Sequence, residues 1–533
     1  MDGVALKVGI YNRWLHTMGG GERYTLTAAQ ALVEQGNQVE LITHRPTSLQ
    51  EVGAKLNMDL SGLALRCVPD LPFHRLGDYT EEYDLFINAS FMSFVPSRAP
   101  KSVLFVYFPF PVDRSPWGLF KRRVGLWLRH QLIVPEYGEG FYGLQQVGGG
   151  WYRWTAEKAL IHLPVVRRGS PMRVRLMIGS FRPGGYPPVP VRLSAAGRLL
   201  AETTLAPTDG NYVPLEVVVP PEATRSDRAT ITLETETFNP QGGPGFEDDF
   251  RDLGVAVAKV KVMGPRHQIY DLLFERLVKE AGLRLHGIPD NLSLRYVDSY
   301  DLITPISRYV QKWLEIYWGK RGEILYPPVD VGVYDPTRPK KNIILNVGRF
   351  FSGSHNKKHL VMIDAFKRLC RKGLSGWELH LAGGVAPGKV HAEYLQRVRR
   401  RAQGFPIFIH TDAPFQELKR LYEESSIYWH ASGYGENENR NPIRFEHFGI
   451  TTVEAMAAGS VPVVIAKAGQ LETVEHGRSG FLWNSLSELE DYTLRVIHDP
   501  ALRASLQQGA IARSRYFNQD SFKKRLLDLI SRI

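Results

Sequence analysis

Cysteine is scarce in this chain of 533 residues, which contains only Cys67 and Cys370. Two cysteines so far apart in sequence argue against a disulfide framework and favour a reducing compartment. Zinc-ligand spacing is also missing. His355 and His359 are four residues apart, but no third ligand accompanies them, so a solvated pair is the expected interpretation. The sequence therefore predicts no bound metal and no disulfide-stabilised fold.

Long apolar runs are missing as well. No run of about 18 apolar residues occurs, so we expect no membrane-spanning helix. Residues 1–9 lack the charged region followed by an apolar core that a signal peptide requires. These features predict a cytoplasmic protein, and its basic character leaves peripheral attachment to the inner face of a membrane open.

The composition is that of an ordinary globular protein, with 43% hydrophobic and 23% charged residues. A chain of this length is expected to form two or three domains. The net charge of +11 fits an anionic partner, which could be a nucleoside diphosphate, an anionic lipid or a nucleic acid. The alternative is that many soluble proteins are simply basic.

One stretch, residues 444–465, carries the clearest pattern. It predicts a loop that ends at Gly449, then a helix in which Thr451 caps the N-terminus and Glu454 completes a capping box. Gly459 suits the left-handed position after such a helix. The apolar run Val461–Ile465 predicts a strand that is buried on both faces of a parallel sheet.

This arrangement has a chemical consequence. A helix N-terminus after a glycine-containing loop presents free N–H groups and suits an anion. Two carboxylates, Glu446 and Glu454, flank it and would repel phosphate, so we expect them to face hydroxyl groups instead. Diphosphate together with hydroxyls describes a nucleotide-sugar. The alternative is that Glu454 is only a capping residue and Glu446 a solvated loop charge.

The segment EHFGITTVEAMAAGSVPVV resembles the signature of the retaining glycosyltransferases of family 4, whose Glu-x7-Glu pattern matches Glu446 and Glu454. The resemblance implies the GT-B fold, with two Rossmann-like domains that face a cleft. It also implies that Glu446 contacts the donor sugar and Glu454 binds the ribose hydroxyls. The backbone contacts to sugar and diphosphate would come from the segment Phe448, Gly449, Ile450 and Thr451. The EHFGI part is similar to lipid-linked mannosyltransferases.

Glycines also mark the first loop of the chain. A strand at Lys7–Tyr11 and a helix at Arg23–Gln35 flank Gly19, Gly20 and Gly21, which allow close approach of a phosphate or sugar. The spacing is neither a Rossmann nor a P-loop fingerprint, so the signal is weak by itself. The family resemblance implies that Gly20 and Gly21 face the donor.

Two further strands of the first domain end in polar residues, which would lie at the ligand-binding edge of the sheet. They predict Asn88 and Tyr107 as contacts to the acceptor or the donor sugar. Family members often carry a histidine near Tyr107. This chain does not, and Tyr107 is the expected substitute.

The segment Trp117–His130 interleaves apolar residues with Lys121, Arg122 and Arg123. A basic amphipathic helix of this kind can lie on an anionic membrane surface. The alternative is a helix that packs its tryptophan face on its own domain.

From about Gly148 the pattern changes to short alternating segments separated by Pro- and Gly-rich turns. This predicts an antiparallel β-sandwich at residues 148–263, inserted into the first domain. It could bind carbohydrate, or serve for packing or oligomerisation. The proline-rich stretch Ile324–Asp330 resembles the family's interdomain connection. The predicted Rossmann-like domains are an acceptor domain, residues 1–147 and 264–328, and a nucleotide-sugar-binding domain, residues 329–533.

Cations follow the first strand of the second domain. Arg349 stands just past the strand, and Lys357 and Lys358 precede the next helix, so they could hold a diphosphate. The resemblance implies that Arg349 and one lysine bind the donor phosphates and stabilise the leaving group. Counting favours Lys357, while Lys358 stands where the family has glycine. Gly383 would lie near the nucleobase.

Together these features predict a retaining, metal-independent hexosyltransferase without a bound cofactor. The donor would be GDP-mannose or a UDP-sugar, and the acceptor a glycan or a lipid-linked hydroxyl. Arg349 and Lys357 would stabilise charge on the leaving diphosphate, and we expect Glu446 to act with them in catalysis. The alternative is a non-catalytic protein that binds carbohydrate or nucleic acid on a GT-B scaffold. Nucleic acid is disfavoured because Trp117–His130 is the only basic stretch with interleaved aromatics.

Overall fold

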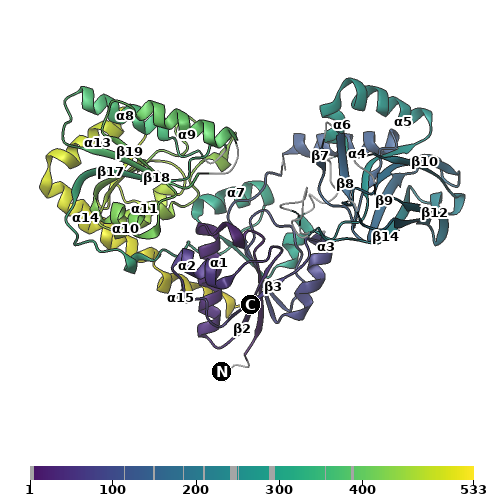
Figure 1. Cartoon of the computed structure of the whole chain (residues 1–533), viewed down its shortest axis with the longest axis horizontal. Helices are drawn as coiled ribbons and strands as arrows, with labels where there is room; N and C mark the ends of the chain where they lie inside the picture. Colours follow the sequence, from purple (N-terminus) through teal and green to yellow (C-terminus); the bar gives the residue numbers. More distant parts are fainter. Residues whose placement is uncertain are drawn as a thin grey trace.

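A computed structural model of the chain describes residues 5–71, 73–112, 115–147, 150–183, 185–207, 211–240, 249, 251–286, 294–353, 356–385 and 389–533. Gly148, where the insert was predicted to start, and His355 lie outside these residues. The first α/β domain forms the base of a V, and a second α/β domain and a β-rich lobe form its arms (Figure 1). No helix within the described ranges is both long and apolar enough to cross a bilayer.

The first domain contains a parallel sheet in the order β16-β5-β4-β1-β2-β3. Its strands are β1 (Lys7–Tyr11), β2 (Gln38–Thr43), β3 (Leu63–Cys67), β4 (Leu85–Asn88), β5 (Lys101–Val106) and β16 (Leu302–Pro305). The helical segments of this domain are η1 (Leu15–Thr17), α1 (Gly20–Glu34), α2 (Leu49–Leu56), α3 (Phe73–Leu76), η2 (Gly77–Glu82), η6 (Leu294–Ser299) and α7 (Arg308–Trp318). Strand β4 is buried along its whole length, as expected of a strand covered on both faces.

The second domain repeats this topology, with a parallel sheet in the order β19-β18-β17-β20-β21-β22. Its strands are β17 (Lys341–Val347), β18 (Glu378–Gly383), β19 (Ile407–Thr411), β20 (Ser425–His430), β21 (Val461–Ile465) and β22 (Phe481–Trp483). Its helical segments are η7 (Val331–Val333), α8 (His359–Arg371), α9 (Lys389–Ala402), α10 (Phe415–Glu424), η8 (Pro442–Arg444), α11 (Ile450–Ala457), α12 (Gln470–Thr473), α13 (Leu486–His498), α14 (Pro500–Ser514) and η9 (Arg515–Phe517). Both sheets place their first strand in the middle, which creates a switch point for ligands at the carboxyl edge.

The β-rich lobe consists of two five-stranded sheets with antiparallel pairing, in the orders β13-β10-β15-β8-β7 and β12-β11-β14-β9-β6. The strands are β6 (Glu136–Tyr137), β7 (Gln145–Val147), β8 (Gly150–Trp154), β9 (Lys158–Pro164), β10 (Met172–Gly179), β11 (Val189–Ala195), β12 (Arg198–Leu205), β13 (Val213–Val219), β14 (Arg228–Thr235) and β15 (Ala256–Val262), with η3 (Pro221–Thr224) between two of them. Buried side chains of both sheets share one core. We interpret this pair of sheets as the predicted inserted β-sandwich.

Helices cover part of this lobe (Figure 1). They are α4 (Pro116–Gln131), α5 (Pro265–Tyr270), the π-helix η4 (Asp271–Leu277) and α6 (Lys279–His286). The chain from Pro265 to His286 thus forms three short helical pieces rather than one helix. Tyr270, Phe274 and Leu285 pack with Leu128 of α4 in a small core of their own.

Three features were not foreseen. Strand β6 pairs with β9, so the antiparallel sheet includes residues ahead of Gly148. Strand β12 was missed. Helix α15 (Gln519–Ile530), which was predicted to belong to the second domain, packs its buried residues Phe522 and Leu526 into the core of the first domain. Its amphipathic pattern predicts a helix but cannot say which domain covers it.

We predict that Leu526→Ala destabilises the first domain by about 2–5 kcal/mol, since Leu526 is fully buried and its truncation leaves a cavity. Hydrogen exchange should speed up in α1, against which α15 packs, for example through the contact of Phe522 with Tyr24. Lys524→Ala, on the exposed side of the same helix, is the control. Faster exchange confined to β17 and β20 would show that α15 belongs to the second domain instead.

Candidate functional site at the carboxyl edge of the second sheet

The predicted site residues of the second domain gather where β17 and β20 end. Gly348 and Arg349 follow β17, and His430 is the last residue of its neighbour β20. The N-terminus of α11 opens nearby, because Tyr428 of β20 donates a hydrogen bond from its hydroxyl to Thr451 Oγ1 at 2.8 Å. This is the switch point of the second sheet.

The start of α11 requires glycine at position 449. Gly449 has a φ of 102°, and a Cβ added there would lie 2.6 Å from Gln470 Nε2. The first turn of a helix leaves backbone N–H groups without intrahelical partners, so Ile450 and Thr451 can present theirs to an anion. Gly459, after the helix, has the expected positive φ of 82°.

The predicted capping box is wrong. Thr451 is the second residue of α11 rather than its cap, and its hydroxyl contacts Tyr428. Glu454 does not fold back on the helix start, because its Oε2 accepts a hydrogen bond from the Tyr422 hydroxyl at 2.8 Å. Two tyrosines, from α10 and β20, therefore bind the side chains that the capping box would have used, and no local pattern could have revealed them.

Two partners hold the Glu446 carboxylate: the ammonium group of Lys357 and the imidazole N–H of His430. Glu446 Oε2 lies 2.5 Å from Lys357 Nζ and 3.0 Å from His430 Nε2. Burial alone would raise the pKa of this carboxyl group, but Lys357 and His430 outweigh it and hold the pKa of Glu446 well below its usual range. Glu446 is therefore a carboxylate, tied to loops that follow β17 and β20.

His430 donates to Glu446 as a neutral imidazole. Burial lowers the pKa of His430, and the hydrogen bond to Glu446 opposes that effect only in part. Because an ionised carboxylate can only accept, Nε2 carries the proton. The other ring nitrogen, Nδ1, is buried and has no hydrogen-bond partner among the described residues, and the same holds for Gln470 Nε2.

Glu454 sits in a different environment. Burial raises the pKa of Glu454 above its usual value, while the Tyr422 hydroxyl and the charge of Arg23 oppose that rise. Arg23 comes from α1 of the first domain, so both domains influence this carboxyl group. The two glutamates therefore differ in charge environment, although they are eight residues apart.

The structure separates the two lysines. Lys357 reaches Glu446, whereas Lys358 Nζ lies 2.7 Å from Glu436 Oε1. A Cβ at Gly348 would lie 2.6 Å from Lys357 Cγ, so this glycine makes room for the lysine stem. Lys358 has a φ of 60°, a left-handed conformation that glycine adopts most easily, which explains how it occupies a position where glycine was expected.

Arg349 is exposed and forms no hydrogen bond or ion pair with the part of the chain that the structure describes. Gly383 ends β18 beside it, and a Cβ there would lie 2.1 Å from the Gly348 carbonyl oxygen. Close packing of two loops thus already requires glycine at 383. Its contact with a nucleobase stays a prediction.

The glycine loop of the first domain meets α11 directly. Helix α1 begins at Gly20, three residues earlier than predicted, because the Glu22 carboxylate accepts a hydrogen bond from the Gly19 N–H at 2.7 Å. A Cβ added to Gly20 would lie 2.9 Å from Ile450 Cδ1. The N-termini of α1 and α11, one from each domain, therefore lie next to each other.

Tyr107 and Asn88 are used inside the first domain. The Tyr107 hydroxyl donates to the carbonyl oxygens of Gly21 and Ala89 at 3.2 and 3.1 Å, and its ring lies against Gly21. Asn88 is fully buried and donates to Ser93 and to Tyr300. The amide of Asn88 thus has internal partners and no exposed surface, so these contacts give no support to a substrate contact at Asn88, which stays a prediction.

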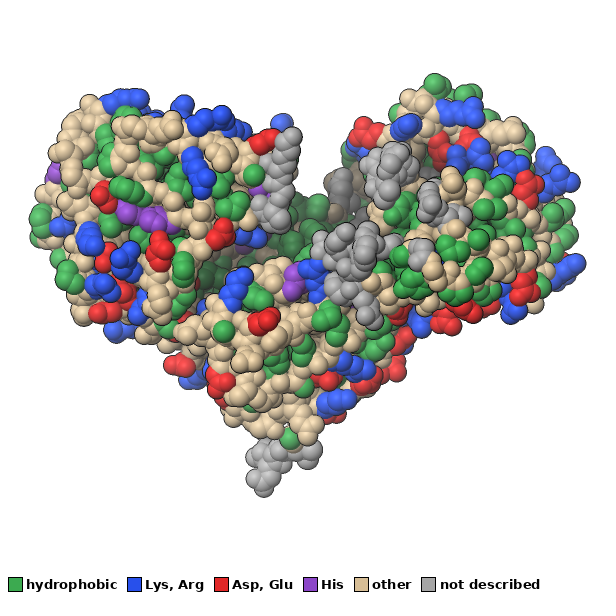
Figure 2. Space-filling view, in the orientation of Figure 1, with side chains coloured by type: hydrophobic (Ala, Val, Ile, Leu, Met, Phe, Trp, Pro, Cys, Tyr) green, Lys and Arg blue, Asp and Glu red, His purple; other side chains and the backbone are tan. Residues whose placement is uncertain are grey.

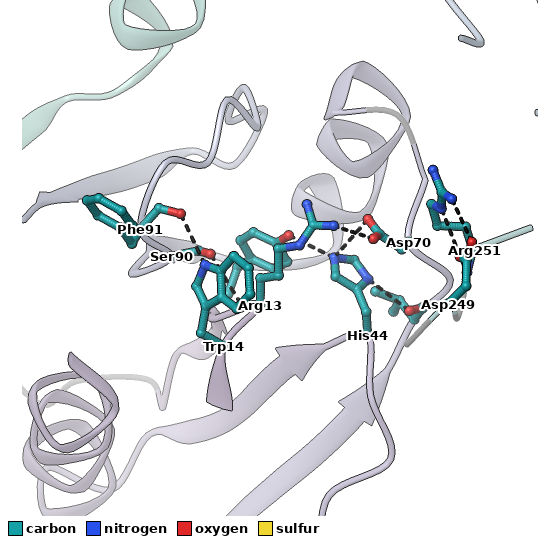
Figure 3. Close-up of polar contacts among 10 residues, drawn as sticks. Arg13, Trp14, His44, Asp70, Ser90, Phe91, Asp249 and Arg251 are labelled. Carbon is teal, nitrogen blue, oxygen red and sulfur yellow. Dashed lines mark hydrogen bonds and ion pairs between the residues drawn. The ribbon is translucent and has the colours of Figure 1, made fainter. Parts of the chain in front are cut away.

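Polar residues that the sequence did not single out line the carboxyl edge of the first sheet (Figure 3). Arg13 forms an ion pair with Asp70 at 2.5 Å, and His44 lies on the other oxygen of Asp70 at 3.6 Å. Trp14 donates its indole N–H to the Phe91 carbonyl at 3.2 Å. Arg13 and Trp14 follow β1, whereas His44 follows β2 and Asp70 follows β3, so only the sheet brings them together.

A second carboxylate joins the domains. Glu472 of α12 accepts hydrogen bonds from the backbone N–H groups of Arg308 and Tyr309, both at 2.8 Å, at the start of α7. Next to it, the ring of His447 stacks on Phe108 of the first domain with centroids 4.4 Å apart. Figure 2 shows the surface hollowed above the first domain, between the two arms of the V.

No group of three or more His, Cys, Asp or Glu side chains is arranged to hold a metal ion within the described ranges. The charged groups gathered at this edge are instead two lysines, an arginine and three glutamates, of which Glu436 is paired with Lys358. This arrangement can bind an anion and hydroxyl groups side by side.

Comparison with solved structures defines the fold. A glycosyltransferase from Rickettsia africae superposes with a TM-score of 0.51 at 12% identity, covering 99% of this chain and 98% of that one. Anabaena HepE, solved in complex with UDP and glucose, superposes with a TM-score of 0.52 at 12% identity, covering 99% and 100%. The chain has the GT-B fold, as predicted.

Comparison of sequences defines the family of the second domain. Residues 335–513 match the family model described as glycosyl transferases group 1. The chain is 28% identical over 226 residues to a GDP-Man:Man(3)GlcNAc(2)-PP-Dol alpha-1,2-mannosyltransferase of Dictyostelium discoideum, covering 39% of this chain and 41% of that protein. It is 28% identical over 232 residues to the alpha-1,3/1,6-mannosyltransferase ALG2 of the same organism, covering 38% and 52%. Residues 335–513 are thus a group 1 glycosyltransferase domain, which confirms the predicted resemblance, and the matches span about half of these relatives' length or less.

We predict that Lys357→Met raises the pKa of His430. Lys357 repels a proton on His430 and shares the Glu446 carboxylate with it, so its removal favours the imidazolium. NMR of histidine-labelled protein, with Lys358→Met as the matched control, measures the shift. An unchanged pKa of His430 in Lys357→Met would contradict the proposed coupling.

The same cluster has a consequence for stability. Because its folded-state pKa lies below the value of an unfolded glutamic acid, about 4.3, Glu446 contributes stability above that pH. This contribution is lost as the pH falls through the folded-state pKa. The acid limb of the unfolding curve should therefore shift to higher pH in Lys357→Met.

Proposed function

We propose that this protein is a retaining hexosyltransferase that moves a sugar from a nucleoside diphosphate sugar to an acceptor hydroxyl. The observation that carries the proposal is the meeting of Glu446, Glu454 and Lys357 around the N-terminus of α11, inside a group 1 glycosyltransferase domain. The phosphate, ribose and hexose of such a donor would each have a protein group there that can bind it.

The donor diphosphate would lie on the N-terminus of α11, where Ile450 and Thr451 offer backbone N–H groups. The Gly20–Ile450 contact supports a donor position between the two domains, because it brings a second helix N-terminus to the same place. Glu454 would receive the ribose hydroxyls, since Tyr422 occupies one oxygen and orients the carboxyl group.

Charge that develops on the leaving diphosphate would be stabilised by Arg349 and Lys357. Arg349 has no competing partner among the described residues and can bind phosphate with two nitrogens. Lys357 is fixed beside Glu446, so little reorganisation is needed when charge appears. Glu446 would hold hydroxyls of the donor sugar, and the unpartnered His430 Nδ1 and Gln470 Nε2 are consistent with polar ligand groups nearby.

The sugar and base of the donor are proposed from two sources. The mannosyltransferase relatives favour GDP-mannose, and the solved Anabaena structure was obtained with UDP and glucose, which keeps UDP-sugars as the alternative. The acceptor would be a lipid-linked or free glycan that approaches along the edge of the first sheet, where Trp14 is exposed beside Arg13.

A donor screen tests the proposal. The matching nucleotide-sugar should raise the melting temperature, since a ligand that binds only the native state stabilises it. The slow hydrolysis of that donor should release a sugar whose anomeric configuration is retained, as read by NMR.

EDTA should leave this activity unchanged, because Arg349 and Lys357 supply the positive charge at the diphosphate. Loss of activity in EDTA with rescue by magnesium would refute the metal-independent part.

Binding without any turnover, across donors and acceptors, would instead indicate a non-catalytic GT-B protein. Oligonucleotides serve as the control ligand in the same assay. Salt-sensitive binding of oligonucleotides without a response to any nucleotide-sugar would overturn the proposal.

We predict that Glu454→Ala and Glu446→Ala act on different steps. Loss of a hydrogen bond to a ribose hydroxyl should weaken donor binding by about 1 kcal/mol or somewhat more in Glu454→Ala. Glu446→Ala should mainly lower kcat. Calorimetry of donor binding and initial-rate kinetics measure the two effects.

A deoxy-nucleotide sharpens this assignment. The wild type should bind a 2′,3′-dideoxy nucleoside diphosphate more weakly than the parent nucleotide, whereas Glu454→Ala should bind both alike. Glu454→Gln, which keeps one acceptor oxygen, should retain part of the preference. If Glu454→Ala still discriminates as the wild type does, then Glu454 does not contact the ribose.

A further inference from the structure

The helices on the β-rich lobe expose an unusual amount of apolar surface. Helix α4 packs on the lobe through its buried residues Gly118, Gly125 and Arg129. Trp117, Phe120, Val124 and Trp127, three or four residues apart, form a stripe on the opposite face of the helix. Trp117 and Trp127 are 62% and 60% exposed. The tryptophan face therefore does not pack on the protein itself, which was one of the two interpretations of this segment.

The aromatic stripe carries cations and no acids. Helix α4 has neither Asp nor Glu in its sequence. The Trp117 and Phe120 rings stack with centroids 5.4 Å apart, and Lys121 Nζ lies over the Trp117 ring. Lys121, Arg122 and Arg123 form no ion pair with described residues.

In the neighbouring π-helix η4 the usual arrangement of a surface helix is reversed, since its acidic side chains face the protein and its leucines face solvent. Its acidic residues Asp271 and Glu275 turn inward, where Lys259 and Lys261 of β15 neutralise them. Its leucines turn outward instead, while Phe274 packs in the small core. The exposed apolar residues in and beside η4 are Ile269, Leu272, Leu273, Leu277 and Val278. Leu277 alone is 70% exposed.

The two exposed faces belong to one helical layer. Leu128 of α4 packs against Tyr270 and Phe274 in a shared core, and Arg266 Nη1 donates to Gln131 Oε1 at 2.7 Å. Arg276 and Lys279 add exposed positive charge beside the outward leucines, again without an ion pair to described residues.

We propose that this helical layer docks on an anionic lipid bilayer. We call it the docking surface and define it by the apolar residues Trp117, Phe120, Trp127, Leu272, Leu273 and Leu277 and the exposed cations Lys121, Arg123, Arg276 and Lys279. Exposed apolar patches of this kind mark sites that are covered in the working protein. Tryptophans and leucines would enter the headgroup boundary, and the cations would contact lipid phosphates.

Charge selects the bilayer over a second copy of this chain. In a symmetric dimer the same patch meets itself. The four unpaired cations would then face one another, with no acidic residue on α4 to offset them. An anionic membrane supplies negative charge for the cations and an apolar interior for the exposed tryptophans and leucines.

Flotation of the full-length protein with vesicles tests the proposal without any donor or acceptor, so its outcome is independent of the proposed function. Vesicles of phosphatidylcholine with phosphatidylglycerol should carry the wild type at low salt, whereas phosphatidylcholine alone should carry much less. Added salt should weaken binding in part only, because the apolar contribution is not screened.

Two variants separate the contributions. Lys121→Glu/Arg123→Glu should weaken binding to anionic vesicles about tenfold or more at low salt. Leu272→Ser/Leu277→Ser, in the second helix, should remove the salt-resistant part and leave folding intact, because both side chains are already exposed.

The chain offers a matched control for charge. Arg397→Glu/Arg400→Glu reverses two exposed arginines of α9 in the second domain and changes the net charge equally. This control should float like the wild type. An equal loss in the control would show unspecific charge attraction and overturn the docking surface. A wild-type dimer in size-exclusion chromatography that Leu272→Ser/Leu277→Ser dissociates would assign the surface to a second copy instead.

Discussion

The arrangement of the candidate site depends on one largely buried carboxylate, Glu446. Removing one partner of such a group typically costs about 3–5 kcal/mol, because the remaining charge is left uncompensated. Lys357 and His430 satisfy it, and they come from the loop after β17 and the end of β20. The ion pair therefore fixes three segments at the switch point of the second sheet before any ligand arrives.

The two α/β domains meet through helix N-termini. Gly20 at the start of α1 touches Ile450 at the start of α11, and Glu472 caps the start of α7 across the domain boundary. Helix starts carry partial positive charge. The Gly20–Ile450 contact brings two such anion-binding ends together at the site, and Glu472 neutralises a third, the start of α7. The pattern explains why the site is shared by both domains.

The same demand for pairing shapes the β-rich lobe. Asp271 and Glu275 turn inward because Lys259 and Lys261 lie on the strand beneath them. Because the acidic side of η4 faces these lysines, the leucines on its other side are exposed to solvent. A buried ionic contact thus produces the exposed apolar layer that we assign to a membrane.

The sequence by itself determined the parallel sheets, because short runs rich in valine and isoleucine such as Val461–Ile465 are typical of buried strands. It also determined the Glu446 and Glu454 pair through a local motif. Only the tertiary structure decided which lysine meets Glu446, that Tyr422 rather than a capping box holds Glu454, and that α15 packs on the first domain. The physical reason is the same in each case. Local periodicity reports that a face is buried, whereas the partner on that face comes from a distant segment that only the folded chain brings near.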